Sequence, residues 1–290
     1  MTTSFGGQSM TWPLRKVLVK RPEACFSVDD IALWNYTSQP DYTVAQQEHD
    51  HLADILRNEG VEVVYHTQPQ PERADAIFVH DPGLVTDAGA VILRMGKSLR
   101  VGEEEALAAF FEQQGIPILH RLSEGALAEG GDILWLDEST LLVGKGFRTN
   151  AQGISELKEV LGEQGIEVLS FDLPYCAGPR ACLHLQSLIS FVDEKLAVVY
   201  EPLMPVAFWQ LLRERGVNLL PICEDEYHRM ATNILATSPK RCVMLEGNPR
   251  TQALLAEAGC HVYTYRGEEL SLKAEGGPTC LTRPLLRVRA

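Results

Sequence analysis

The sequence predicts an α/β fold made of five similar units that close into a ring. Two apolar residues, three spacers, a glycine and two alternating apolar residues recur along the chain, with glycines at Gly60, Gly115, Gly165, Gly216 and Gly259. The repeats lie about fifty residues apart, which is typical of one supersecondary unit used repeatedly. An orphan apolar segment at 16–19 can supply the strand that the last repeat lacks. The alternative is an open α/β sheet whose helices end in glycine, but the near-constant spacing favours the ring.

Each repeat is predicted to contain a helix end, a glycine and a strand. In the second repeat, Leu107, Phe110 and Phe111 fall on one face of a helix. Gly115 follows where a helix ends in a left-handed residue. Alternating apolar residues then predict a strand.

Two further strands are predicted in each repeat, joined by a tight turn. The second strands are expected at 76–79, 133–136, 188–191, 234–236 and 279–281. The third strands are expected at 90–93, 141–143, 196–199 and 242–245, with 16–19 completing the last unit. Closing the ring would also remove free sheet edges.

Composition narrows the class of protein. The repeats run along most of the 290 residues, so we expect one domain spanning 1–290 and no membrane span. A net charge of −13 argues against nucleic acid as a partner; it suits a cationic substrate, or it serves only solubility. Residues 1–8 do not resemble a signal peptide, and seven cysteines without zinc-type spacing suggest reduced thiols in the cytoplasm.

A reactive polar residue lies near the second strand of each repeat. These residues are Asp81, Glu129 with Asp132, His184, Asn233 and Cys280. If the ring closes, equivalent positions converge, and the scattered residues form one central site.

Cys280 lies in the most informative local segment, after Gly276, Gly277 and Pro278. The glycines allow a backbone to approach a ligand closely, and a cysteine beside a histidine can be a covalent nucleophile. The alternative is a buried structural thiol, as free cysteines usually are. We adopt that alternative for the other cysteines, which are Cys25, Cys176, Cys182, Cys223, Cys242 and Cys260.

Two other segments are ambiguous by themselves. Glu129-Gly130-Gly131-Asp132 could bind a metal or a cation, or simply form a turn. His184 lies between apolar neighbours and could be a core residue. Because His80, His120 and His228 show no ligand spacing, no metal is predicted.

Taken together, the motifs resemble the guanidine-modifying (pentein, or amidinotransferase-like) superfamily. Its members include arginine deiminases, amidinotransferases and dimethylarginine dimethylaminohydrolases, and its fold is a five-unit αβ propeller. The matching motifs are Asp75-x-x-Phe78-x-x-Asp81, Glu129-Gly130-Gly131-Asp132, Arg148-Thr149-Asn150, Leu183-His184-Leu185 and Gly276-Gly277-x-x-Cys280.

The resemblance implies a role for each residue. Cys280 would be the nucleophile and His184 the general acid and base, while Asp81 and Glu129 would hold the guanidinium. The remaining substrate-binding residues would be Asp75, Phe78, Arg100, Arg148 and Asp132, with both arginines binding an amino-acid carboxylate. The partner would be a small guanidino compound, with neither metal nor organic cofactor, and a homo-oligomer stays open.

Position 186 helps to choose within the superfamily. Deiminases and amidinotransferases generally carry His-x-Asp, whereas Gln186 stands here, as in dimethylarginine hydrolases with a non-acidic residue. His80 is a departure, because those hydrolases usually carry glutamate at this position. A second departure is an insert at 26–42, whose residues Trp34, Asn35 and Tyr36 could form a lid or could be ordinary packing. The resemblance therefore favours a cysteine-dependent hydrolase of a substituted guanidine. An amidinotransferase, an arginine or citrulline hydrolase and a non-catalytic binding protein are the alternatives.

Overall fold

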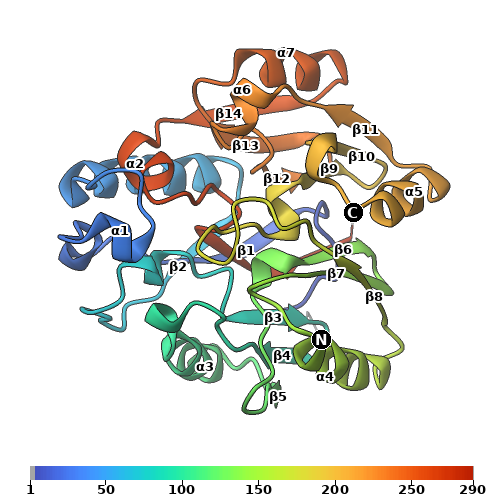
Figure 1. Ribbon diagram of the computed structural model, residues 1–290, viewed down its shortest axis with the longest axis horizontal. Helices are drawn as coiled ribbons and strands as arrows, with labels where there is room; N and C mark the ends of the chain where they lie inside the picture. The colour runs from blue at the N-terminus through green and yellow to red at the C-terminus, as the bar shows by residue number, and fades with distance from the viewer. Residues whose placement is uncertain (1–3, 290) are drawn as a thin grey trace.

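The computed structural model describes residues 4–289, so the first three residues of the polar N-terminal segment lie outside it. Its strands form five three-stranded sheets, which follow one another around a centre (Figure 1). The sheets have the orders β15-β1-β2, β3-β4-β5, β6-β7-β8, β11-β10-β9 and β12-β13-β14. In each, the inner and middle strands are antiparallel, and a helix leads from the middle strand to an outer strand parallel to it.

One edge strand of every sheet faces the centre of the ring. These inner strands are β3 (Gly83–Thr86), β6 (Ile133–Asp137), β9 (Ile189–Asp193), β12 (Leu235–Ser238) and β15 (Thr282–Arg287). All five contribute residues to one small cavity of about 40 Å³, among them Leu84, Trp135, Phe191, Ala236 and Arg287. The predicted five-unit α/β ring is confirmed.

The middle and outer strands are connected by helices. The middle strands are β1 (Leu14–Val19), β4 (Gly89–Ile92), β7 (Thr140–Lys145), β10 (Leu196–Val199) and β13 (Arg241–Leu245). The outer strands are β2 (Glu62–Tyr65), β5 (Ile118–Arg121), β8 (Glu167–Asp172), β11 (Asn218–Pro221) and β14 (His261–Tyr265). The connecting helices are α2 (Tyr42–Asn58), α3 (Glu103–Gln113), α4 (Ala151–Gly162), α5 (Val206–Glu214) and α7 (Pro249–Glu257). Two short helices, α1 (Ile31–Trp34) and α6 (Glu224–Tyr227), lie outside this scheme, and among residues 4–289 no helix is long and apolar enough to cross a membrane.

The recurring glycine motif is a helix C-cap. Each of the five glycines has a positive φ, between 72° and 83°. In every case the residue after the glycine donates its N–H to the carbonyl five residues earlier, as Val61 does to Leu56 and Ile116 to Phe111. This is the Schellman motif, in which apolar residues at these two positions commonly pack together. The apolar pair, the glycine and the next apolar residue therefore encode one local structure.

The N-terminal strand completes the last unit, as predicted. Val17 of β1 pairs with Pro284 of β15 on one side and with Val63 of β2 on the other.

Two predicted second strands were wrong. Residues 74–77 form a 3-10 turn and residues 279–281 a turn, and the strands begin later, at Gly83 and Thr282. Both segments are apolar because they are buried, and an apolar run this short does not distinguish a turn from a strand.

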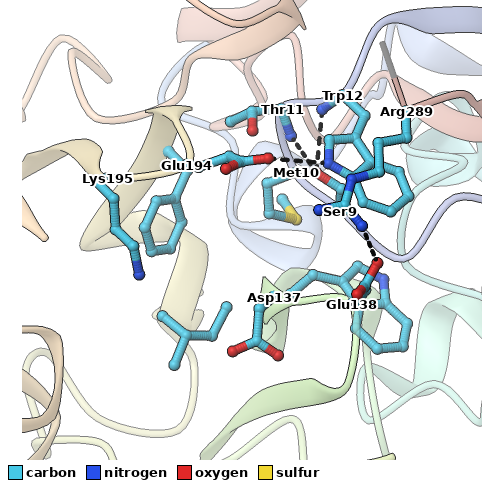
Figure 2. A pocket seen from close by; sticks show the side chains of 12 residues that line it. Ser9, Met10, Thr11, Trp12, Asp137, Glu138, Glu194, Lys195 and Arg289 are labelled. Carbon is cyan, nitrogen blue, oxygen red and sulfur yellow. Dashed lines mark hydrogen bonds and ion pairs between the residues drawn. The ribbon is translucent and has the colours of Figure 1, made fainter. Parts of the chain in front are cut away.

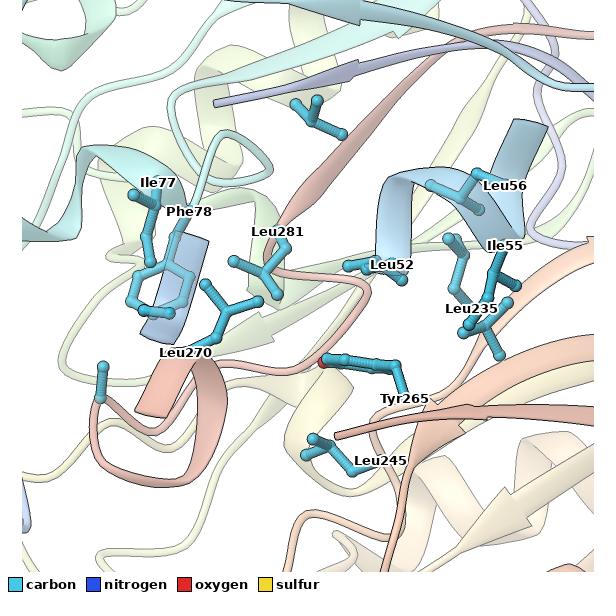
Figure 3. Close-up of a cluster of buried hydrophobic side chains, with 14 of the residues drawn as sticks. Leu52, Ile55, Leu56, Ile77, Phe78, Leu235, Leu245, Tyr265, Leu270 and Leu281 are labelled. Carbon is cyan, nitrogen blue, oxygen red and sulfur yellow. The ribbon is translucent and has the colours of Figure 1, made fainter. Parts of the chain in front are cut away.

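The largest apolar cluster supports the turns before β3 and β15. Leu52 and Leu56 of α2 lie in it together with Tyr265 of β14 (Figure 3). Phe78 and Leu281 belong to the same cluster, so the core fixes the two segments that carry Asp81 and Cys280.

Candidate active site

The turns that precede the inner strands bring the predicted residues together. A cavity of about 230 Å³ is lined by Asp81, His184, Asn233 and Cys280, which come from four different units. Glu129 and Asp132, from the remaining unit, lie directly behind His184. The convergence expected from ring closure is therefore present in the structure.

The paired glycines allow these turns to touch. A side chain at Gly131 would collide with the His184 ring, and one at Gly130 with the carbonyl of His80. A side chain at Gly276 would likewise collide with Phe78. The glycines of both motifs are thus needed for close approach between units.

Cys280 is held by an asparagine. Asn233 donates from Nδ2 to the Cys280 Sγ over 3.2 Å, and its Oδ1 accepts from the Thr279 N–H and hydroxyl at 3.0 and 2.7 Å. Burial and the charge of Asp81 raise the pKa of Cys280, against opposing effects of Asn233 and His184. Without a ligand, Cys280 is therefore a neutral thiol.

His184 carries a proton. Its Nε2 lies 2.7 Å from Oε2 of Glu129, which is completely buried. Burial alone would lower the pKa of His184, but Cys182, Asp132 and Glu129 raise it well above its ordinary value. The imidazolium donates to Glu129 and can act as an acid.

Glu129 lies behind His184 and outside the cavity lining. Its carboxylate accepts from the backbone N–H of Gly96 and Lys97 at 2.9 and 3.1 Å and from Arg148 at 3.2 Å. Burial acts to raise the pKa of Glu129, but the bond to His184 and the charge of Arg148 bring it below its ordinary value. With these partners Glu129 orients His184, and it is not among the residues that line the cavity.

Asp132 lies deeper still. Its oxygens accept from the Leu185 N–H at 3.0 Å and the Thr149 hydroxyl at 2.7 Å, and burial raises the pKa of Asp132 to about 6. It fixes the turn that carries His184, so the structure does not bring it into contact with the cavity.

Asp81 faces the cavity as a carboxylate. Its Oδ1 accepts from the Gly131 N–H at 2.9 Å and its Oδ2 from Arg100 at 2.6 Å. Burial would raise the pKa of Asp81, but Arg100 and His184 lower it well below its ordinary value. Asp81 is thus an anion in the same cavity as Cys280.

The resemblance implied that Arg100 binds the carboxylate of an amino-acid substrate, but its guanidinium is bound by the protein itself. Each of its guanidinium nitrogens donates to a protein group: Nε and Nη2 to Glu103, Nη2 also to the Phe78 carbonyl, and Nη1 to Asp81. Glu103, in the first turn of α3, forms an ion pair with Arg100 over 2.7 Å and so fixes its orientation. Arg100 is better described as the residue that positions Asp81.

Asp75, Phe78, Arg100 and Arg148 line the cavity, and their role in substrate binding stays a prediction. Both oxygens of Asp75 already have partners, because Oδ1 accepts from the Tyr36 hydroxyl at 2.8 Å and Oδ2 from Lys97 at 2.5 Å. The insert thus reaches the site: Tyr36 is buried against Asp75, and Trp34 and Asn35 line the cavity.

Sequence reasoning missed several lining residues. Cys182 was interpreted as a buried structural thiol, but it is exposed, lines the cavity and lies 3.5 Å from the His184 Nδ1. Cys176 is exposed as well, whereas Cys242 and Cys260 are buried. Lys97 and Arg180 also line the cavity, and no local pattern marks them. Glu275, directly before the paired glycines of the Cys280 segment, lines it as well.

His80 and Gln186 lie beneath the site. His80 Nδ1 is 2.9 Å from the Thr282 carbonyl, and its Nε2 is 2.9 Å from the Gln186 amide. Gln186 also donates to the carbonyls of Gly130 and Ile133, so it fastens the Glu129–Asp132 turn. Burial lowers the pKa of His80 to about 3, which keeps the ring neutral. Within residues 4–289, no group of three or more His, Cys, Asp or Glu is arranged to hold a metal ion.

A separate cavity of about 130 Å³ lies beside Met10 and Trp12 (Figure 2). Its polar lining includes Glu138, Glu194 and Arg289, and it contains no cysteine or histidine. Of these two cavities, only the one of about 230 Å³, called the central cavity below, is lined by Cys280 and His184.

Comparison with known proteins gives a consistent result. A family model described as N,N-dimethylarginine dimethylhydrolase, eukaryotic, matches residues 33–287. The uncharacterized protein YkgA of Bacillus subtilis is 28% identical, over 94% of this chain and 92% of its own length. The N(G),N(G)-dimethylarginine dimethylaminohydrolase of Pseudomonas aeruginosa is 25% identical, over 92% of this chain and 98% of its own length. An arginine deiminase of Borrelia recurrentis is 26% identical, over 82% of this chain and 66% of its own length.

Solved structures share the fold. The Pseudomonas aeruginosa enzyme, as a mutant complexed with citrulline, superposes with a TM-score of 0.78 at 24% identity, covering 96% of this chain and 100% of that one. The N-terminal domain of ArgZ, a cyanobacterial arginine dihydrolase, superposes with a TM-score of 0.80 at 22% identity, covering 94% and 97%.

Proposed function

Because the chain belongs to the N,N-dimethylarginine dimethylhydrolase family, we propose that it hydrolyses a C–N bond of an arginine-type guanidine. The products are a ureido compound and an amine or ammonia. The observation that carries the proposal is the thiol of Cys280 in one cavity with the carboxylate of Asp81 and the imidazolium of His184. Since every unit contributes to this site, we propose that residues 1–290 act as one catalytic domain.

Binding comes first in the proposed mechanism. The planar guanidinium pairs with Asp81 through charge-assisted hydrogen bonds, which direct its central carbon toward sulfur. Arg100 and the Gly131 N–H hold the Asp81 carboxylate in place for this contact. The bound cation lowers the pKa of Cys280, because a nearby positive charge favours the thiolate.

The covalent step consumes the thiolate. Cys280 loses its proton to solvent, and its sulfur attacks the guanidinium carbon to form a C–S bond. The imidazolium of His184 donates its proton to the leaving nitrogen, and the C–N bond breaks. An amine or ammonia departs and a thiouronium remains on Cys280.

Hydrolysis reverses the role of His184. The neutral imidazole, still oriented by Glu129, takes a proton from water, and the hydroxide adds to the thiouronium carbon. The added hydroxyl then loses its proton to solvent as the C=O bond forms and the C–S bond breaks, which returns the Cys280 thiolate and releases the ureido product. No step requires a metal or an organic cofactor.

The experiment measures both products from a panel of guanidines. We expect ureido compound and amine or ammonia in equal amounts, without any acceptor amine. Cys280→Ser should lose at least about 10³-fold in kcat, because removing a catalytic nucleophile has effects of this size or larger. Product formed only when an acceptor amine is added would indicate a transferase. Activity of Cys280→Ser above about a tenth of the wild-type rate would contradict the nucleophile assignment.

A further inference from the structure

Beyond the reacting groups, the central cavity has a second set of charged residues. These residues are Asp75, Lys97, Arg148, Arg180 and Glu275. They are the groups that a substrate's non-reacting end can meet. Their pairing therefore indicates which charges that end can carry.

The ammonium of Lys97 already pairs with Asp75, one of the two anions in this set. Its Nζ lies 2.5 Å from Asp75 Oδ2 and 2.7 Å from the Trp34 carbonyl oxygen, and 5.2 Å from the centre of the Trp34 ring. The other oxygen of Asp75 accepts from the Tyr36 hydroxyl. The side chains of Lys97 and Asp75 are only 12% and 6% exposed. An ammonium of the chain itself thus fills a site composed of a carboxylate, a carbonyl and an aromatic face.

The other anions that line the cavity do not replace Asp75 as a partner for a substrate ammonium. Asp81 is bound by Arg100 and is the partner of the guanidinium in the proposed mechanism. Glu275 is exposed to solvent, where an ion pair contributes little. The remaining charged groups, Arg148 and Arg180, are cations, and Arg180 is exposed to solvent.

We propose that Lys97 makes the enzyme select ω-guanidino carboxylates that lack a free ammonium beside the carboxylate. This substrate class rests on the proposed function of the same site. A free α-amino acid would place its ammonium near that of Lys97 with Asp75 already paired, and like charges at close range repel. A carboxylate without that ammonium can instead accept hydrogen bonds from Lys97 and Arg148.

A matched pair of substrates tests the selection. Arginine and 5-guanidinopentanoate differ only in the α-amino group, and their Nω,Nω-dimethyl derivatives provide a second pair. Butylguanidine, with a neutral tail, reports on the guanidine chemistry alone. We expect wild-type kcat/KM to be at least about tenfold higher for the compound without the amino group, since hydrogen bonds to charged groups are worth about this factor or more.

Variants of Lys97 show whether it causes the preference. Lys97→Met frees Asp75 to bind an ammonium, so the ratio of kcat/KM between the paired compounds should fall by about tenfold or reverse. Lys97→Arg keeps the charge and should keep the preference. Lys145→Met removes a lysine that pairs with Asp172 at the surface, outside the cavity, and should leave the ratio at the wild-type value.

The outcomes separate this inference from the proposed function. A wild-type preference for arginine, or an unchanged ratio in Lys97→Met, overturns the inference while the guanidine chemistry stands. If no guanidine is turned over and none protects Cys280 from alkylation, the proposed function fails and the inference fails with it. A lost preference in Lys97→Met that Lys97→Arg retains supports the inference even if the methionine variant is less stable, because the ratio is internal to each protein.

Discussion

At the scale of single residues, the site rests with a neutral thiol beside an imidazolium, and not as an ion pair of thiolate and imidazolium. Burial and Asp81 raise the pKa of Cys280, while Cys182, Asp132 and Glu129 raise the pKa of His184 against the effect of burial. His184 therefore begins as an acid, and Cys280 depends on the charge of the substrate. A site that is inactive until a cation enters is protected from unspecific alkylation and oxidation, which require the thiolate.

This dependence predicts how alkylation of Cys280 varies with pH. In the free protein, labelling by iodoacetamide should rise only above the pH at which an ordinary thiol reacts, because a raised pKa leaves less thiolate at neutral pH. A non-reactive cation small enough to bind beside Asp81 should move the profile to lower pH. Peptide mapping by mass spectrometry gives the rate at Cys280, and exposed Cys176 serves as the internal control. A midpoint below that of Cys176 would contradict the assigned resting state.

The two carboxylates nearest the reacting groups should differ when neutralised. Asp81→Asn removes the direct partner of the guanidinium, so KM should rise and kcat/KM should fall by about 10- to 100-fold. Glu129→Gln acts through His184, so kcat should fall with little change in KM. Because protonated His184 is the acid, the fall in its pKa should move the alkaline limb of the pH profile to lower pH. Steady-state kinetics across pH distinguish the two. Equal changes in KM would mean that Glu129 also contacts the substrate.

Whole elements show why parts of the structure could be predicted from sequence. The five helix ends follow from a local motif, since the left-handed glycine and the apolar residues on either side belong to one turn. The turns at 74–77 and 279–281 could not be recognised, because burial makes them as apolar as strands. Lys97 and Cys182 depend on contacts between units, so nothing near them in the sequence indicates a place in the site.

Two glycines of the third repeat offer a matched test of the helix ends. Gly165 has a φ of +75°, whereas Gly162, the last residue of α4, does not have a positive φ. A Cβ added at either position would meet no atom within 4 Å. Gly165→Ala should lower the free energy of unfolding by about 1–2 kcal/mol, the cost of a left-handed residue with a Cβ. Gly162→Ala should leave it unchanged or raise it by about 0.5–1 kcal/mol. Urea unfolding measures both, and equal effects would contradict the C-cap assignment.

The whole molecule is a ring in which one sheet combines the first and the last strand of the described residues. The Gly6 N–H donates to the Leu285 carbonyl, and β1 lies between β15 and β2. The ring explains why the predicted residues meet although they are spread over the sequence from Asp81 to Cys280.

Because Gly6 lies against β15, a circular permutant should remain active. Joining the two ends by a short flexible linker and opening the chain between Glu138 and Ser139, which are exposed in the β6–β7 turn, should leave kcat/KM within about tenfold. Opening the chain between Gly131 and Asp132 is the control, since it separates buried residues beneath His184 and should abolish activity. An inactive but folded first permutant would show that the break itself disturbs the site.

The position of β1 also has a consequence for synthesis on the ribosome. β1 is made well before its antiparallel partner β15, so this middle strand has one unpaired edge until β15 has been synthesised. The same interval delays Cys280, which lies just before β15. A nascent chain therefore lacks Cys280 for almost all of the time that this sheet is open, and one segment, from Cys280 through β15, completes both the catalytic site and the ring.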